Sequence, residues 1–427
     1  MSERKMIYLC LAHMSEAGME QKYVKEAFDT NWVVPMGPNV NAFEGDLANM
    51  ANSKSDGSEP LDRKVVCLSA GTAAVHLALI ACGVKAGDEV LVQSFTFCAS
   101  SHPITYLGAK PVFVDSECET WNMDPELLEK AIIERKEKTG KYPKAIIPVA
   151  LYGMPYDCEK IMAIADKYGI PVVEDAAEGM GSRFNGQVLG TFGRFGVLSF
   201  NGNKMITTSG GGALICRTAE DANEIMWYAT QARDAYPYYE HTAIGYNYRM
   251  SNVCAGIGRG QMTVLDDHIA HHKHVQQLYR ELLADVPGVT LHDQSADGRY
   301  DSNFWLCAAT LDPSVKIVGQ ENAYKEVIKS AVGGAAGVIK AVDSAVTDCQ
   351  PNDNVEALRV FMLDKKVECR PVWKPMHKQP VYADAVAYVN GVSEEIFKVG
   401  FCLPTGPYVT DEDVKYIVEC IKEAIVK

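Results

Sequence analysis

Apolar and polar positions alternate along the first half of the chain in a pattern that predicts strands and helices in turn. Short apolar runs predict buried strands, and longer stretches with one apolar face predict helices. The predicted strands are Val65–Ser69, Glu89–Gln93, Pro111–Val114, Ala145–Ala150 and Pro171–Glu174. The predicted helices between them are Thr72–Cys82, Ala99–Leu107, Pro125–Lys138 and Cys158–Tyr168. This alternation is typical of βαβ units, so it predicts a mostly parallel sheet with helices on both faces.

The pattern changes beyond about residue 270. Before that point, further helices are predicted at Gln21–Phe28, Val40–Met50 and Val253–Leu265. After it, strands are predicted near Thr290 and at Trp305–Thr310, and an amphipathic helix at Asp411–Val426. We therefore expect an α/β fold with a large N-terminal domain, residues 1–270, and a smaller α+β domain, residues 271–427.

Composition narrows the class of partner and the compartment. The net charge of −14 argues against nucleic acid or an anionic membrane as partner, although a local positive group can still bind a small anionic substrate. No apolar stretch reaches the roughly 20 residues that cross a bilayer. The thirteen cysteines show no CxxC spacing, which is typical of free thiols in a reducing compartment. We expect a cytoplasmic protein.

The stretch from Val172 to Gly212 carries the main candidate chemistry. Asp175 follows a predicted buried strand, at the sheet edge where α/β proteins bind ligands. Lys204 follows a second short β-like run, Gly196–Phe200, and glycines on both sides allow a planar ligand to approach. A lysine amine and an upstream aspartate are what pyridoxal phosphate (PLP) requires. Taken alone, each residue has a plainer interpretation: Lys204 as a surface lysine and Asp175 as a helix cap.

Three further stretches have both a functional and a structural interpretation. Ser69–Ala74 joins a strand to a helix, where free N–H groups can bind a phosphate, or where Thr72 simply caps the helix. Phe97, after the next strand, can stack on a flat ring or belong to the core. The turn Gly245–Asn252 places Asn247 and Arg249 among aromatic residues, which suits an interface or a ligand contact.

Four histidines lie at helical spacing, and the i, i+3 and i, i+4 positions share a helix face. They are His268, His271, His272 and His274. No acidic or cysteine ligand completes a metal site there, and histidine-rich helix faces are usually solvated. We therefore expect no metal.

Taken together, these stretches resemble the DegT/DnrJ/StrS family of PLP-dependent nucleotide-sugar aminotransferases. The resemblance runs from Gly37-Pro38 to Leu403-Pro404. It is carried by Gly71–Ala74, Phe95–Phe97, Glu174–Glu178, Ser199-Phe200 with Lys204, Gly245–Arg249, and Arg370-Pro371 with Trp373–His377. It implies the fold-type I (aspartate aminotransferase-like) architecture. The Ala/Gly/Val-rich segment Val318–Gln350 departs from the family's pattern, because it is longer than the small domain usually needs.

The resemblance also implies residue roles. Lys204 is implied to hold PLP and to move the proton, and Asp175 to pair with the pyridine nitrogen. The implied cofactor-binding residues are Gly71, Thr72, Ala73, Phe97, Asp175, Glu178, Ser199, Lys204 and Asn247. Asn247 is implied to reach the phosphate of a neighbouring subunit, so a homodimer with shared active sites is expected. The implied substrate-binding residues are Pro38, Arg249, Trp373, Met376 and His377.

The implied reaction moves an amino group from L-glutamate to the keto carbon of a nucleotide-linked sugar. The loop around Trp373 and His377 resembles the branch that acts on UDP-4-keto-6-deoxy-N-acetylhexosamines; GDP- and dTDP-linked keto sugars are the alternatives. A sugar dehydratase of the same family would generally have histidine in place of Lys204, and a non-enzymatic regulator would tend to lose the cofactor residues. A dehydrogenase would need a GxGxxG stretch, which Ser69–Ala74 is not.

Overall fold

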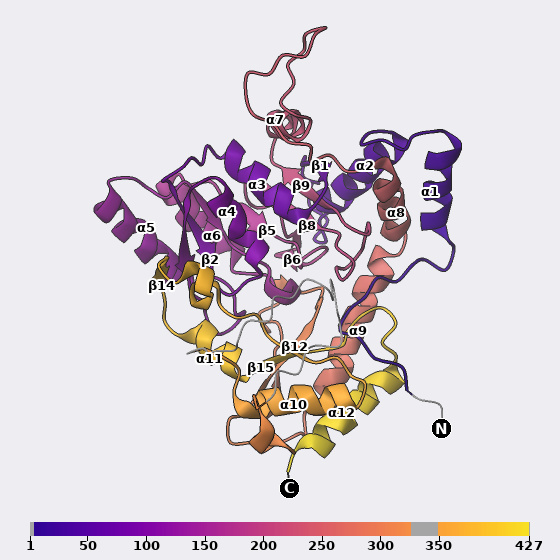
Figure 1. Cartoon of the computed structure of the whole chain (residues 1–427), viewed down its shortest axis with the longest axis vertical. Coiled ribbons are helices and arrows are strands. Elements are labelled where there is room, and N and C mark those ends of the chain that lie inside the picture. The colour runs from indigo at the N-terminus through magenta and orange to yellow at the C-terminus, as the bar shows by residue number, and fades with distance from the viewer. Residues whose placement is uncertain (1–3, 326–348, 427) are drawn as a thin grey trace.

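The computed structural model describes residues 4–325 and 349–426. Residues 326–348, which make up most of the Ala/Gly/Val-rich segment, lie outside the described residues. In Figure 1 a larger α/β part occupies the upper half of the molecule and a smaller part lies below it, around β12 and β15.

The larger part is built on a central sheet. Two four-stranded groups, ordered β1-β9-β8-β5 and β14-β3-β2-β4, are joined by parallel bridges from Ile146 to Val172 and from Val149 to Asp175. The pairing is parallel except at β9, which is antiparallel to both neighbours. The strands are β1 Lys64–Leu68, β2 Glu89–Gln93, β3 Lys110–Val114, β4 Ala145–Ile147, β5 Val173–Asp175, β8 Phe195–Ser199, β9 Gly212–Cys216 and β14 Val386–Tyr388. This is the mostly parallel sheet that the sequence predicts.

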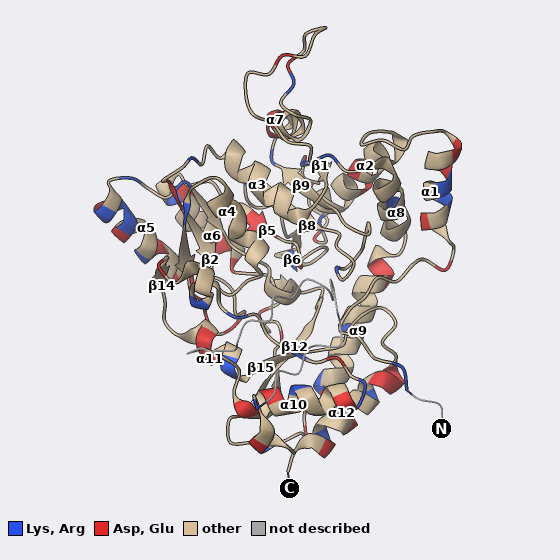
Figure 2. Cartoon of the chain, viewed as in Figure 1, with Lys and Arg blue, Asp and Glu red and all other residues tan. Residues whose placement is uncertain are grey.

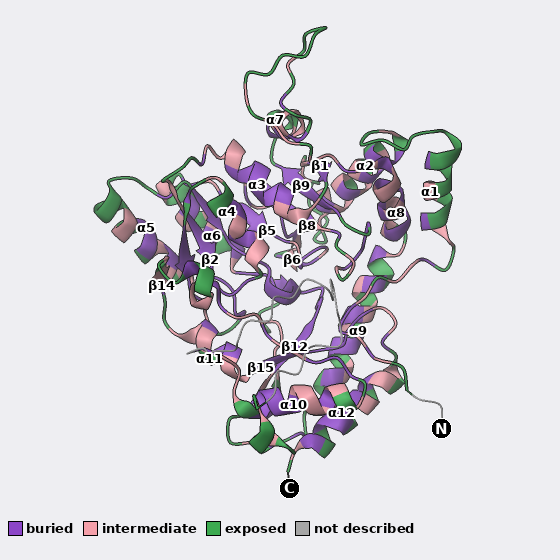
Figure 3. Cartoon of the chain, in the orientation of Figure 1, coloured by how far each residue is buried: buried purple, intermediate pink, exposed green. Residues whose placement is uncertain are grey.

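Helices cover both faces of this sheet, and the strand side chains alternate between two apolar cores. In β1, Val65 and Cys67 contribute to one core while Val66 and Leu68 contribute to the other. The helices of this part are α3 Gly71–Ala81, α4 His102–Tyr106, α5 Pro125–Thr139, α6 Cys158–Tyr168 and α7 Ala219–Ala229. Figure 3 shows the buried strands between them. Burial on both faces explains why these strands read as continuous apolar runs.

Three helices pack together beside the sheet: α1 Met19–Asp29, α2 Pro38–Asn52 and α8 Asn252–Met262. Glycines of α8 allow this close packing, because a Cβ on Gly258 would overlap the ring of Phe43 and one on Gly260 would overlap the backbone of Glu20. The Ala/Gly-rich composition of the predicted Val253–Leu265 helix therefore reflects helix–helix contact.

The smaller part has an antiparallel sheet ordered β10-β12-β15-β13. Its strands are β10 Val289–Leu291, β12 Cys307–Leu311, β13 Arg370–Pro371 and β15 Gly400–Leu403. Its helices are α9 Leu265–Leu283, α10 Asp353–Asp364, α11 Val392–Val399 and α12 Asp411–Ala424. The predicted domain boundary at residue 270 falls inside α9, which runs from the larger into the smaller part (Figure 1). Strand β14 also crosses back to pair with β3. A third small sheet, ordered β11-β6-β7, joins Tyr300–Asp301, Arg183–Phe184 and Gln187–Val188.

Some predicted elements differ from the observed ones for local reasons. Strand β4 ends at Ile147 because Pro148 has no N–H to donate to a ladder. The predicted helix Ala99–Leu107 is split into a 3-10 turn, Cys98–Ser100, and α4, which has proline near its start. None of the helices in the described ranges combines the length and the apolar character needed to span a bilayer. Charged residues lie mainly on outer helices such as α5 and α12 (Figure 2).

Candidate active site

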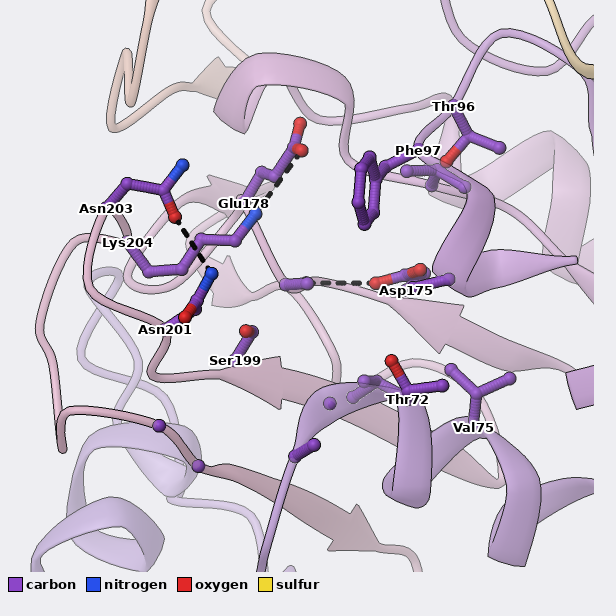
Figure 4. A pocket seen from close by; sticks show the side chains of 18 of the residues that line it. Thr72, Val75, Thr96, Phe97, Asp175, Glu178, Ser199, Asn201, Asn203 and Lys204 are labelled. Carbon is purple, nitrogen blue, oxygen red and sulfur yellow. Dashed lines mark hydrogen bonds and ion pairs between the residues drawn. The ribbon is translucent and has the colours of Figure 1, made fainter. Parts of the chain in front are cut away.

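A cavity of about 230 Å³ opens beside the carboxyl ends of the central strands. Its wall is formed by residues that follow β1, β5 and β8 and by the first turn of α3 (Figure 4). The predicted site residues that line it are Gly71, Thr72, Phe97, Asp175, Glu178, Ser199, Lys204 and Trp373. The fold thus brings distant stretches of sequence together at the edge where α/β sheets bind ligands.

Lys204 lies on the turn that follows β8. Its amide N–H donates to the carbonyl of Asn201 at 3.0 Å, and its side chain extends into the cavity (Figure 4). Nζ lies 3.4 Å from Oε1 of Glu178 and 4.1 Å from the centre of the Trp305 ring. Only 12% of the side chain is exposed. Lys204 is therefore directed inward, unlike a surface lysine.

Asp175 is the last residue of β5 and is buried. Its Oδ2 accepts a hydrogen bond from the Ser100 hydroxyl at 2.6 Å, and its Oδ1 accepts one from the Ala177 N–H at 3.1 Å. Burial raises the pKa of this carboxyl, opposed by the two hydrogen bonds and by the charge of Lys204. Within the described chain the next element after β5 is the short strand β6, so Asp175 caps no helix.

Glu178 connects Lys204 to the main chain of Tyr152. One carboxylate oxygen accepts the Tyr152 N–H at 2.8 Å, and the other faces Nζ of Lys204. Burial raises the pKa of Glu178, and the positive charge of Lys204 opposes this shift. The carboxylate and the ammonium therefore stabilise each other inside the cavity.

The first turn of α3 can bind an anion. No side chain caps this helix, because its N-cap residue is Ala70. The first N–H groups are thus left for a ligand, and the helix dipole favours a negative charge there. A Cβ on Gly212 would overlap the amide nitrogen of Gly71, so glycine in β9 allows α3 to begin this close to the strand. The Thr72 and Ser199 side chains face the same space (Figure 4).

Aromatic rings form a second wall. Phe97 is 48% exposed, and its ring centre lies 5.3 Å from that of Trp373. Trp373 stacks on Tyr152 at 6.2 Å, and Tyr152 stacks on Trp305 at 6.5 Å. A phenylalanine this exposed is not a core residue, and its face is accessible to a planar ligand.

Comparison with known proteins identifies the family. The model of the DegT/DnrJ/EryC1/StrS aminotransferase family matches residues 15–336 and 340–422. The chain belongs to this family. It is 40% identical over 421 residues to the putative pyridoxal phosphate-dependent aminotransferase EpsN of Bacillus subtilis, a match that covers 98% of this chain and 95% of that protein.

Other members of the family are similar over most of their length. A GDP-perosamine synthase of Escherichia coli O157:H7 is 32% identical over 98% of this chain and 99% of its own. A UDP-2-acetamido-2-deoxy-3-oxo-D-glucuronate aminotransferase of Pseudomonas aeruginosa is 36% identical over 90% and 89%. The crystal structure of a family aminotransferase from Brucella abortus shares the fold, with a TM-score of 0.79 and 24% identity over 95% of each chain. The expected fold-type I architecture is confirmed.

The chain is thus a PLP-dependent sugar aminotransferase, and its cavity fits this cofactor. A buried carboxylate with a raised pKa, Asp175, is stabilised as an anion by a cationic partner such as a protonated ring nitrogen. An uncapped helix start suits a phosphate, and an inward lysine supplies the amine. The remaining predicted cofactor residues lie outside the cavity: Ala73 is buried within α3, and Asn247 is exposed.

Two predicted substrate-binding residues of the aminotransferase lie away from this cavity. The Arg249 guanidinium is buried, donating to Oε1 of Glu44 at 2.6 Å and to the carbonyl of Cys67 at 2.8 Å. Pro38 is an exposed residue at the start of α2. In this chain Arg249 therefore lies along the edge of β1 opposite β9, where an isolated antiparallel bridge also pairs it with Leu68.

The loop that carries Trp373, Met376 and His377 is held in place by contacts of Met376 and His377 with the larger part and with α11. Met376 is buried in the core next to the sheet. His377 lies between Ser94 and Glu394, with Nδ1 2.6 Å from the Ser94 hydroxyl and Nε2 3.1 Å from a Glu394 oxygen. Of the three, only Trp373 lines the cofactor cavity.

The four histidines of α9 bind protein atoms. In the described ranges no group of three or more His, Cys, Asp or Glu side chains could hold a metal ion. His268, His271 and His272 face the carbonyls of Met205, Gly406 and Phe304, and His274 faces Asp411. His268 and His272 are buried, contrary to the solvated face expected.

Several further residues of the site were given no individual role from the sequence, although Ser69 and Thr96 lie in stretches that it singled out. Ser69, Thr96, Asn201, Asn203 and Trp305 also line the cavity. The sequence pattern places Trp305 in a strand of the smaller domain, more than one hundred positions from Lys204, and no local spacing links the two. Only the packing of the two parts of the molecule brings the indole to the lysine.

Proposed function

We propose that the aminotransferase transfers an amino group from L-glutamate to the keto carbon of a nucleotide-linked 4-keto-6-deoxy sugar. The observation that carries this proposal is the convergence of Lys204, Asp175 and the uncapped start of α3 on one cavity. Family membership supports a sugar as the amino acceptor.

The proposed roles follow from the contacts of each residue. PLP, when bound, supplies an electron sink that stabilises the carbanion next to the transferred nitrogen. Lys204 anchors the cofactor and moves the proton, because its Nζ reaches the cavity from the turn after β8. Asp175 would keep the ring nitrogen of bound PLP protonated, and the Ser100 hydroxyl holds that carboxylate in place. Glu178 keeps the free amine of Lys204 close to the cavity wall. Gly71, Thr72 and Ser199 line the cavity and would bind the phosphate.

The assignment of Lys204 can be tested directly. Borohydride reduction of the PLP-loaded protein, followed by peptide mapping, should place the reduced cofactor on Lys204. Label on another lysine would contradict the assignment. The donor is tested by measuring 2-oxoglutarate release from glutamate against a set of other amino acids.

For the acceptor we propose a UDP-4-keto-6-deoxy-N-acetylhexosamine, which the reaction converts to its 4-amino sugar for the biosynthesis of a surface polysaccharide or glycan. The support is the loop from Arg370 to Pro380, whose Trp373 borders the cavity. A GDP-linked keto sugar is the second candidate, favoured by the similarity to GDP-perosamine synthase. Rates with UDP-, GDP- and dTDP-linked 4-keto sugars decide between them, and faster turnover of a GDP or dTDP substrate would contradict the UDP assignment.

We also propose a cytoplasmic homodimer with shared active sites. Asn247 is exposed and does not line the cavity of its own chain, so it is free to reach a partner's phosphate. The segment between α7 and Asn247 projects from the top of Figure 1 and exposes Tyr236, Tyr238 and Tyr239. Exposed aromatic side chains of this kind are enriched at protein interfaces.

A mixed dimer tests this sharing. Lys204→Ala and Asn247→Ala homodimers should each be severely impaired. In a mixed dimer, the site on the Asn247→Ala chain keeps its own Lys204 and receives Asn247 from the partner chain. We expect about half the wild-type rate from mixed dimers isolated with two different tags. A rate no higher than that of the better homodimer would refute sharing.

A further inference from the structure

The two main-chain carbonyls that flank Lys204 are each held by a ring N–H from a distant segment. Nε1 of Trp305 donates to the carbonyl of Asn203 at 2.7 Å. Nδ1 of His268 lies 3.1 Å from the carbonyl of Met205. Since a carbonyl oxygen only accepts, this imidazole nitrogen carries the hydrogen. The turn that carries Lys204 is therefore held by a hydrogen bond on each side of the lysine.

Helix α9 contacts both the Lys204 turn and the Trp305 segment. His272 lies one helical turn after His268, and its Nδ1 donates to the carbonyl of Phe304 at 3.1 Å, directly before Trp305. Burial lowers the pKa of His268 and lowers that of His272 to about 3, so both rings are neutral near pH 7. One face of α9 thus sets the position of the Lys204 turn relative to the Trp305 segment.

The segment around Trp305 is itself well held. The Trp305 N–H donates to Oδ1 of Asn303 at 2.9 Å, and the Thr405 hydroxyl donates to its carbonyl at 2.8 Å. Trp305 is 1% exposed. The centre of its ring lies 4.1 Å from Nζ of Lys204, and Nζ also faces the Glu178 carboxylate. A cation over an indole face is attracted to it, most strongly where water is excluded.

We propose that Trp305 is a positioning residue for Lys204: its N–H fixes the main chain before the lysine, and its ring holds the free amine toward the cavity. His268 fixes the main chain after the lysine, and His272 holds Trp305 in place. This inference rests on the proposed role of Lys204 as the PLP-binding lysine.

The test compares variants that remove these contacts one at a time. Trp305→Phe removes the N–H and keeps a ring face, whereas Trp305→Leu removes both. His268→Leu removes the donor on the other side, and His268→Asn keeps an amide N–H near the position of Nδ1. Trp121→Phe is the matched control, because Trp121 is also a buried indole, stacked on His292, but does not line the cavity.

The first measurement is amide hydrogen exchange in cofactor-free protein, on a peptide covering residues 200–208. The Lys204 and Thr208 amides are hydrogen-bonded within this peptide and report its local opening. We expect exchange about tenfold faster in Trp305→Phe and in His268→Leu, as for the loss of one hydrogen bond. Exchange in α5 should be unchanged, and His268→Asn should exchange like the wild type.

The second measurement is the rate at which added PLP becomes attached to Lys204, followed by the absorbance of lysine-bound PLP. We expect this rate to fall about tenfold in Trp305→Phe and about a hundredfold in Trp305→Leu. Trp121→Phe should keep the wild-type rate. Under saturating substrates, Trp305→Phe should lower kcat with little change in KM for the sugar.

The inference is overturned if Trp305→Phe and His268→Leu both match the wild type in local exchange and in PLP attachment. It is also overturned if exchange rises equally across the whole chain, because that result means general destabilisation. If Trp305→Leu does not fold, Trp305→Phe and the two His268 variants still test the inference. If wild-type Lys204 does not bind PLP, the proposed function fails, whereas the exchange measurement on cofactor-free protein tests the positioning independently.

Discussion

The contact between Arg249 and Glu44 allows a decisive test of what Arg249 does. Both side chains hold the main chain of Cys67 in β1: Glu44 accepts its N–H at 2.8 Å, and Arg249 donates to its carbonyl at 2.8 Å. The Arg249 side chain is 7% exposed and that of Glu44 is 17% exposed. This arrangement predicts that Arg249→Met weakens the fold by uncovering the edge of β1, two residues before the loop that leads to α3.

The expected loss follows from the burial of the pair. Removing one partner of a buried ion pair leaves an uncompensated charge and typically costs about 3–5 kcal/mol. In Arg249→Met the Glu44 carboxylate keeps the Cys67 N–H, so we expect a loss at the lower end, about 3 kcal/mol. Glu44→Gln in the same chain removes the unpaired charge and keeps an acceptor. The loss of unfolding free energy in the double variant should therefore be about 1–2 kcal/mol smaller than the sum of the two single losses.

The assay is urea-induced unfolding of cofactor-free protein at one protein concentration. Lys25→Met is the control, because Lys25 pairs with Asp29 on an exposed helix face and should lose less than about 1 kcal/mol. The KM for the nucleotide sugar is then measured on folded Arg249→Met protein and should stay within about twofold of the wild type. Unchanged stability together with a tenfold higher KM would show that Arg249 contacts substrate, and would refute this reasoning.

Two further outcomes are expected. Gly212→Ala should weaken PLP binding by at least about tenfold in a fluorescence titration, because its Cβ would push the start of α3 away from β9. Gly45→Ala in α2, which has open space around it, is the control. Equal PLP affinities of the two variants would contradict the close-contact argument. Lowering the pH from 7 to 5 should cost about 2 kcal/mol of unfolding free energy through His272, because burial holds its folded pKa at about 3 and the unfolded chain binds the extra proton below about pH 6.5. Urea titrations at both pH values should show that His272→Asn loses about 2 kcal/mol less unfolding free energy between pH 7 and pH 5 than the wild type does. An equal loss in the two proteins would contradict the assignment to His272.

The sequence alone was enough to predict the parts of the site that sit at the ends of strands. Asp175 and Lys204 are recognisable because a buried apolar run precedes each of them, and small residues mark the turns. The start of α3 is recognisable for the same reason. These features are local, and the periodicity of the chain carries them. The antiparallel direction of β9 is not local, because an apolar strand reads the same in either direction.

Arg249 and the histidines of α9 show that local sequence patterns do not predict distant contact partners. An arginine beside aromatic residues suits a ligand contact as well as a buried ion pair, and the choice depends on Glu44, some two hundred positions away. Histidines at i and i+4 mark one helix face but not its partner. The partners here are the main-chain carbonyls of Met205 and Phe304, and backbone atoms leave no trace in the pattern of side chains.

The placement of Lys204 depends on both parts of the molecule. The strand before the lysine belongs to the central sheet, whereas Trp305, on whose ring the amine rests, comes from the segment that leads into β12. Helix α9 contacts both segments through two histidines one turn apart. A shift of the smaller part relative to α9 would therefore move the indole away from Nζ, while leaving Asp175 and the start of α3 in place. The position of the lysine that would attach the cofactor therefore depends on how the two parts are packed.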